Sequence, residues 1–140
     1  MATFVSQELR DALLNSYFTG GARPTQLFLR LYTDNATITD TSTLADVSAN
    51  EQVGSGYAVK TIAMTDWTVE ADATGRRARM ANKTWTTTAD NWGTLRWAVI
   101  CTSADDTGTI LLAKDYGGGK TVTGIGANVT VDTLFYQLND

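Results

Sequence analysis

The sequence contains no histidine, and this absence excludes several kinds of catalytic site. Serine and cysteine nucleophiles commonly need an imidazole as their general base, and many zinc sites use imidazole ligands. The chain has one cysteine, Cys101, so it forms no internal disulfide and no cysteine-rich metal site. Its position among apolar residues predicts a buried small side chain rather than a reactive thiol. We expect no enzymatic activity, no metal and no cofactor.

Positive charge is also scarce in this chain. The 11 lysine and arginine residues face 15 aspartate and glutamate residues, which gives a net charge of −4. Proteins that bind nucleic acid through its phosphates need clustered basic residues. The longest basic cluster, Arg76-Arg77-Ala78-Arg79, follows a predicted turn at Gly75 and is typical of a solvated turn or a subunit salt-bridge patch. We therefore expect no nucleic-acid partner.

Long apolar runs are missing as well. A membrane-spanning helix needs about 18 consecutive apolar residues, and the sequence has no run of that length. The segment from Met1 to Glu8 also lacks the charged and apolar parts of a signal peptide. We expect a soluble protein that is made in a reducing cytosol and has no membrane partner.

The residues that are abundant favour β-structure. Hydrophobic residues are 43% of the sequence and charged residues 19%, which is sufficient for a folded core. Frequent threonine, with valine, tyrosine and tryptophan, fits the pleated surface of a sheet. The 12 glycines supply turns, and the single proline leaves the predicted strands unbroken. At 140 residues, the chain has the length of one domain.

The N-terminal segment has a different pattern. Apolar residues recur there every three or four positions; they are Val5, Leu9, Ala12, Leu13 and Tyr17. This spacing predicts an amphipathic helix over residues 1–18, with Thr3 or Ser6 as its N-cap and Gly20-Gly21 as its end. We assign residues 1–20 to a helix or arm that either covers one end of the β-domain or docks on a neighbouring subunit.

From residue 25 onward the pattern changes to the period of two that is typical of strands. About eight short apolar runs, separated by turn residues, predict an antiparallel β-sandwich or jelly-roll-like domain over residues 25–140. The chain is thus predicted to be a mainly β, single globular domain with a short N-terminal α-helix. The polar stretch from Thr33 to Glu51 is too long for an ordinary turn and is predicted to be a functional or mobile loop.

The segment from Trp92 to Cys101 is predicted to form a central strand. Every second residue from Leu95 onward is apolar, so one face of the strand is suited to a core. We expect Trp97 to be buried between the two sheets with Leu95 and Val99. Trp92 lies at the preceding turn, where it seals one end of the domain or meets a partner.

The candidate motifs for anion, metal and sugar binding are explained better by ordinary turns. The segment from Gly117 to Thr121 lacks the first glycine of a phosphate-binding loop and leads into a strand instead of a helix. Asp105-Asp106 lacks the spaced ligands of a calcium loop. Trp67 and Trp92 lie near aspartates, but aromatic residues at turn edges also seal the ends of sandwiches. These two residues are our candidates for surface aromatics that meet a partner.

An ordered set of short motifs resembles a known group of proteins. After the N-terminal helix, the landmarks are Leu27 to Thr33, Gly54 to Ala58, Trp92 to Val99, Gly108 to Leu112 and Val129 to Leu138. Their order is similar to that in a family of small virion proteins of tailed bacteriophages, described as head-decoration or tail-associated proteins. The resemblance covers most of the chain from about Leu27 onward.

The resemblance implies a structural part of the virion, made in the host bacterial cytoplasm, with no catalytic residues. We expect a capsid decoration or cement protein that forms a homotrimer and stabilises the head by contact with the major capsid protein. The candidate docking residues are Phe4, Val5, Leu9, Leu13 and Tyr17. The alternative is a tail or tail-fibre component that binds a receptor or glycan through Trp67, Trp85 and Trp92.

Overall fold

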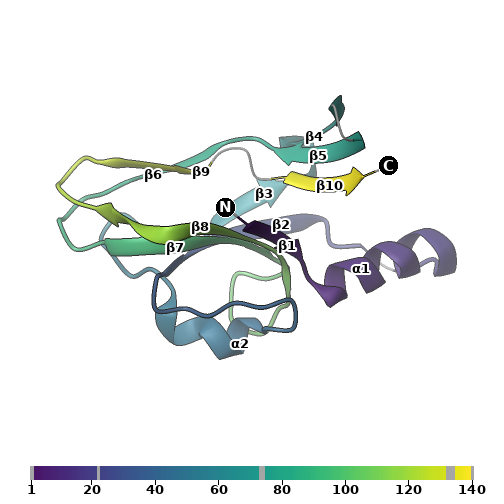
Figure 1. The fold of residues 1–140 in the computed structure, drawn as a ribbon, viewed down its shortest axis with the longest axis horizontal. Coiled ribbons are helices and arrows are strands. Elements are labelled where there is room, and N and C mark those ends of the chain that lie inside the picture. Colours follow the sequence, from purple (N-terminus) through teal and green to yellow (C-terminus); the bar gives the residue numbers. More distant parts are fainter. Residues whose placement is uncertain (1, 22, 73–74, 132–134, 140) are drawn as a thin grey trace.

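The structure, a computed structural model, describes the chain except for residues 1, 22, 73–74, 132–134 and 140. It is mainly β, with antiparallel sheets and a short N-terminal helix, which confirms the predicted fold class (Figure 1). The strands are β1 (Ala2–Val5), β2 (Gln26–Thr33), β3 (Lys60–Ala63), β4 (Trp67–Asp72), β5 (Gly75–Met80), β6 (Lys83–Thr86), β7 (Gly93–Cys101), β8 (Ile110–Val122), β9 (Asn128–Val131) and β10 (Phe135–Asn139). The helices are α1 (Gln7–Leu14) and α2 (Leu44–Val47), with a π-helical turn at Asn15–Thr19 and 3₁₀ turns at Ser48–Asn50 and Met64–Asp66. In the described ranges, no helix has the length and apolar character needed to cross a membrane.

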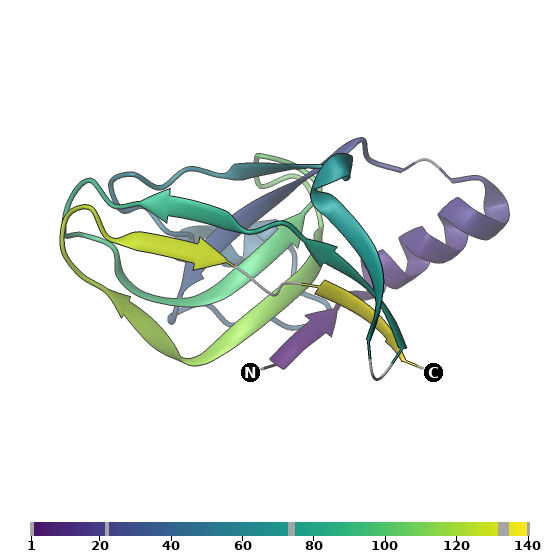
Figure 2. The ribbon, with the colours of Figure 1, turned by 90° about the horizontal axis from the view of Figure 1, so that it is seen from above.

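The strands form two layers that face each other, as Figures 1 and 2 show. One layer is a five-stranded sheet in the order β1-β8-β7-β2-β3. The other layer contains a three-stranded sheet, β10-β5-β4, and a two-stranded sheet, β6-β9. Neighbouring strands in these sheets run antiparallel. The chain therefore forms the sandwich that the turn spacing predicts.

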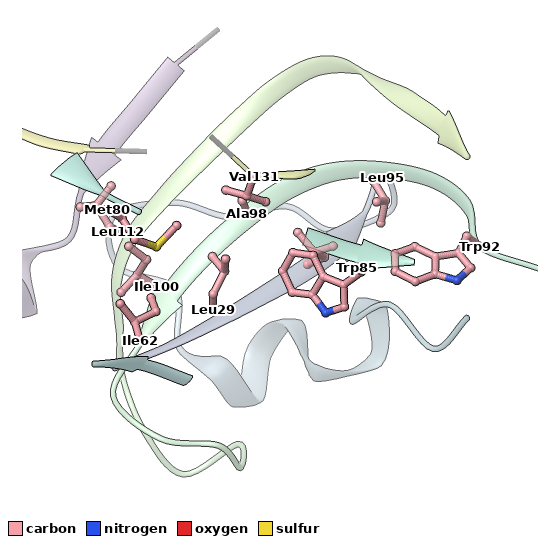
Figure 3. Close-up of a cluster of buried hydrophobic side chains, with 11 residues drawn as sticks. Leu29, Ile62, Met80, Trp85, Trp92, Leu95, Ala98, Ile100, Leu112 and Val131 are labelled. Carbon is pink, nitrogen blue, oxygen red and sulfur yellow. The ribbon is translucent and has the colours of Figure 1, made fainter. Parts of the chain in front are cut away.

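The main hydrophobic core lies between the layers. It contains Leu29, Leu31, Ile62, Met80, Trp85, Trp92, Leu95, Ala98, Ile100, Leu112 and Val131 (Figure 3). Met80, Trp85 and Val131 come from the smaller sheets, so they hold the second layer against the first. Removal of these side chains from water supplies most of the favourable free energy of folding.

A second core lies on the opposite face of the five-stranded sheet, under residues 33–51. It contains Tyr32, Ala36, Ile38, Leu44, Val47, Trp97, Val99, Cys101, Ile110 and Ala113. Helix α2 is short, but Thr43 and Asp46 form a reciprocal capping box at its start. The segment predicted to be a functional or mobile loop thus forms a cover with an apolar underside. The residues of this segment that point into the second core follow no regular spacing. The polar composition of the segment therefore gave no sign that it covers a core.

A β-bulge in β7 places parts of one strand in different cores. The register of β7 with its neighbours shifts between Leu95 and Trp97, so Leu95 faces the main core and Trp97 the second core. The prediction that Trp97 lies between the sheets is therefore wrong. Its ring is buried beneath residues 33–51, where its Nε1 donates to the Ala36 carbonyl oxygen at 3.0 Å. Val99 accompanies Trp97 in the second core.

The N-terminal segment differs from the predicted continuous helix. Ala2–Val5 forms strand β1, which pairs with β8, so Phe4 and Val5 belong to the sheet and not to the helix. The edge of β8 offers unpaired backbone groups, which an added strand satisfies and a helix does not. Gly20, with a φ of 75°, follows the helical segment as predicted.

Helix α1 begins after Ser6, the N-cap, whose side chain accepts a hydrogen bond from the Leu9 backbone N–H at 3.1 Å. Ser6→Ala removes this cap and should lower the free energy of unfolding by about 1 kcal/mol. Urea unfolding followed by circular dichroism measures the change. The matched control Ser16→Ala, in the π-helical turn, should change it by less than about 0.5 kcal/mol. An equal loss in both variants would contradict a capping role for Ser6.

Candidate interaction surface

An apolar groove lies between α1 and the two layers. One part, of about 140 Å³, has an apolar lining made of Leu9, Leu13, Leu27, Trp67, Ala78, Ile100, Leu111 and Leu112. The adjoining part, of about 290 Å³, is lined by Glu8, Leu9, Ala12, Leu13, Ser16, Arg23, Pro24, Leu27, Met64, Thr102, Thr109 and Leu111. We call the two parts together the α1 groove.

Helix α1 is anchored at its start and projects at its end. The Ser6 N–H donates to the Leu111 carbonyl oxygen at 3.1 Å, and the Gln7 N–H donates to the Asp40 carbonyl oxygen at 3.3 Å. Figures 1 and 2 show that the rest of the helix extends away from the sheets. Leu13, which lines the groove, is 43% exposed. The chain therefore fills its own groove incompletely.

The structure brings together three of the predicted contact residues. Leu9 and Leu13 line the groove from α1, and the half-buried Trp67 lines it from the start of β4. Nothing in the sequence links Trp67 with the helix, because the two are distant in the chain and meet only through the sandwich. The other predicted docking residues have side chains outside the described part of the chain; they are Phe4, Val5 and Tyr17.

Trp92 is not a surface residue, contrary to the prediction. It is 2% exposed, and its indole Nε1 donates to the Ser55 carbonyl oxygen at 2.8 Å. Gly54 lies so close to the ring that a Cβ there would be 2.5 Å from it. The glycine-containing turn at residues 54–56 therefore folds over Trp92. That turn, rather than the strand, is the sequence signal for its burial.

Trp85 is buried in the same way, and its Nε1 donates to the Ala58 carbonyl oxygen at 2.6 Å. The Tyr57 ring centroid lies 5.9 Å from both indole rings, stacked on Trp85 and edge-on to Trp92. These aromatic rings stabilise the core and offer no face on which a sugar could stack. The predicted glycan surface of Trp67, Trp85 and Trp92 is thus not assembled, and we do not propose it.

Asp66, the aspartate beside Trp67, has a structural role. Its Oδ2 accepts hydrogen bonds from Lys83 Nζ and from the Ala63 N–H, each at 2.9 Å. These two hydrogen bonds, first that from Lys83, hold the pKa of Asp66 below its usual value. The carboxylate ties β6 to the turn before β4 and is not free to bind a ligand.

The lowered pKa of Asp66 predicts how stability responds to acid. Its carboxylate stabilises the fold above the unfolded pKa of about 3.9, and this contribution is lost as the pH falls through the lower, folded pKa. We expect Asp66→Asn to reduce the loss of stability between neutral and strongly acidic pH. Urea midpoints across that range measure the effect. Lys83→Met removes the partner and should act similarly, whereas an unchanged acid dependence in both variants would contradict the assignment.

A buried arginine, which the sequence analysis missed, joins two loops to the sheet. Arg30 lies within β2 and is 1% exposed. Its Nη1 is 3.2 Å from Glu51 Oε2 and 3.0 Å from Asp106 Oδ1. Its Nη2 donates to the carbonyl oxygens of Ser103 and Asp105. The sequence signal that could have revealed this cluster is a charged residue inside an otherwise apolar strand. Such a residue is expected to be buried, and a buried guanidinium needs carboxylate partners.

The Arg30 cluster continues into the main core. Glu51 Oε1 accepts a hydrogen bond from the Tyr57 hydroxyl at 2.8 Å, and that hydroxyl accepts one from the Leu31 N–H at 3.1 Å. Burial raises the pKa of Tyr57, so the hydroxyl remains a donor at neutral pH. The hydrogen bonds and ion pairs of this network hold the two loops against the sheet, and of the guanidinium nitrogens only Nε, which is buried, has no hydrogen-bond partner among the described residues. Across the described residues, no group of three or more acidic or cysteine side chains is placed to hold a metal ion.

A protein-family model matches the chain from residue 4 to residue 132. The family is described as "Podophage GP4 fiber I protein gp80". The matched region includes the α1 groove and the Arg30 network. No curated protein matches the chain.

Proposed function

The chain belongs to the podophage GP4 fiber I protein gp80 family, and we propose that it is a structural subunit of the phage tail fibre. Membership makes it a structural protein of the bacteriophage virion, produced in the host. The observation that supports the proposal is the match over residues 4–132, because the family description names a fibre. The expected capsid decoration role has less support, since nothing in that description refers to the head.

The architecture supports a role in contact rather than in chemistry. Two cores and a buried ion network hold the domain together, while the α1 groove leaves apolar side chains exposed beside a projecting helix. Exposed apolar surface of this kind is typical of sites where proteins bind one another. A fibre subunit needs such surfaces, because only contacts with its neighbours keep it in the virion.

The position of the protein in the virion tests this proposal. Gold-labelled antibodies against the purified chain should mark the tail of intact virions in electron micrographs. Mass spectrometry should detect the chain in separated tails and not in separated heads. An antibody against the major capsid protein, which should mark heads, is the control. Label on the heads would overturn the proposal and favour capsid decoration.

A further inference from the structure

The outer face of the second layer carries two neighbouring arginines. Figure 2 looks down on this face, which is formed by the outward positions of β4, β5, β6 and β9. Met80 is buried in the main core, and side chains alternate along a strand, so Arg77 and Arg79 of β5 point away from the core. By the same alternation Arg76 lies on the opposite face. The basic cluster of the sequence is therefore divided between two faces, and the pair on the outer face lies beside Glu70 of β4.

Arg79 is held in place and keeps part of its guanidinium unused. Its Nε donates to Glu70 Oε1 at 3.1 Å, and the same oxygen accepts a hydrogen bond from Arg77 Nε at 2.7 Å. The Arg79 side chain is 44% exposed, and we find no hydrogen bond or ion pair for its Nη1 and Nη2 within the described ranges. Two N–H groups of one guanidinium match the two oxygens of a carboxylate. A guanidinium that is already oriented loses less conformational entropy on binding.

The rest of this face is polar and uncharged. Its outward, exposed residues in the neighbouring strands are Thr68, Thr84, Thr86, Asn128 and Thr130. Thr68 lies directly opposite Arg79 in the register of β4 with β5, and the hydroxyls of Thr84 and Thr130 lie 2.9 Å apart. None of the outward positions in the strands β4, β5, β6 and β9 holds a large apolar residue. Protein interfaces usually have an apolar centre, which these four strands do not provide.

We propose that this face binds an acidic polysaccharide. In this contact Nη1 and Nη2 of Arg79 donate to a carboxylate of one sugar unit. The side chains of Thr84, Thr130 and Asn128 form hydrogen bonds with the hydroxyl groups of further units along the layer. A sugar chain offers hydroxyls on each unit, which suits a face of threonine and asparagine better than an acidic protein segment does. Nucleic acid is disfavoured, because the chain has a net charge of −4 and binding to phosphates needs clustered basic residues.

The proposed sugar site goes beyond the tail assignment and does not depend on it. Sugar binding is measured on the purified chain, whereas the position of the protein is measured on intact virions. Either result can therefore fail without the other. Because the whole molecule is negatively charged, it does not attract a polyanion at long range, and binding has to come from a local site.

Immobilised polygalacturonate and alginate, both polymers of carboxylated sugars, test the site by biolayer interferometry. The wild-type chain should bind at least one of them and should not bind polygalacturonate whose carboxylates are methyl-esterified. Arg79→Gln should weaken binding about tenfold, because the charge-assisted hydrogen bonds are lost. Arg79→Lys, which keeps the charge and loses the planar fork, should weaken binding less. Thr130→Val removes a hydroxyl without a change of charge and should weaken binding about threefold.

Arg10→Gln provides the matched control, because it removes the same charge from an exposed position of α1. It should leave binding unchanged, and circular dichroism shows whether each variant keeps its fold. The proposal would be overturned by a wild-type chain that binds neither polymer or binds the esterified polymer equally well. It would also be overturned if folded Arg79→Gln bound as tightly as wild type, or if Arg10→Gln lost as much affinity. Equally tight binding to polyglutamate would reject the sugar and favour an acidic protein segment.

Discussion

Arg30→Met is expected to lower the free energy of unfolding by about 3–5 kcal/mol, the range found when one partner of a buried ion pair is removed. The substitution leaves Glu51, whose side chain is 20% exposed, without its cation. It also leaves the carbonyl oxygens of Ser103 and Asp105 without their donor. Asp106 contributes less, because its side chain is 51% exposed and water replaces the arginine. Urea unfolding followed by tryptophan fluorescence measures the loss.

An ion pair at the surface provides the control for Arg30. Arg96, with a side chain that is 37% exposed, lies 2.9 Å from Asp115. Arg96→Met should therefore lower stability by no more than about 1 kcal/mol. The double variant Arg30→Met/Glu51→Leu should recover part of the loss, because no carboxylate then stays buried beside the apolar side chain. If Arg30→Met and Arg96→Met lowered the free energy of unfolding by the same small amount, the buried cluster would not be a main determinant of stability.

Trp97→Ala is the second substitution with a large expected effect, a loss of about 3–5 kcal/mol. Trp97 is 6% exposed and occupies the second core, so its truncation leaves a cavity beneath residues 33–51. The Ala36 carbonyl oxygen also loses the donor that now lies 3.0 Å away. Denaturant unfolding measures the loss, and Val69→Ala, at a side chain that is 67% exposed, should change stability by less than about 0.5 kcal/mol.

Limited proteolysis tells which core Trp97 supports. In Trp97→Ala the cover at residues 33–51 loses the indole ring that packs beneath it and the hydrogen bond to Ala36, so cleavage there should become faster than in wild type. Trp85→Ala opens the main core instead and should accelerate cleavage near the turn at residues 54–56. If Trp97→Ala exposed residues 54–56 before residues 33–51, the ring would belong between the sheets, and the bulge would be wrongly placed.

The period of two in the sequence was sufficient to predict the sheet architecture, because alternation reports which residues share a face of a strand. It failed at Trp97, because a bulge inserts one residue and reverses the alternation after it. The pattern is the same with or without that insertion, so only the register with β2 and β8 reveals it. The strand β1 was missed for a similar reason, because it also depends on a neighbouring strand. The open edge of β8 favours a strand over a helix at Ala2–Val5, and the local sequence pattern does not contain that edge.

The candidate site could be predicted only in part. The apolar spacing of α1 identified Leu9 and Leu13, because a helix stripe is a local pattern. Their meeting with Trp67 depends on tertiary packing, which no local pattern contains. Trp92 was misplaced because its exposure depends on the approach of Gly54, and Arg30 was overlooked because its partners are contributed by two distant loops.

The bulge in β7 also bears on how the domain responds to force. Strand β7 (Gly93–Cys101) contributes buried side chains to both cores. It is also paired along both of its edges, with β8 on one side and β2 on the other. Removal of this strand from the sheet would therefore disrupt both cores and both of its hydrogen-bonded ladders at once, whereas the cover at residues 33–51 can open without moving it. A pull that reaches β7 thus meets the combined resistance of both cores.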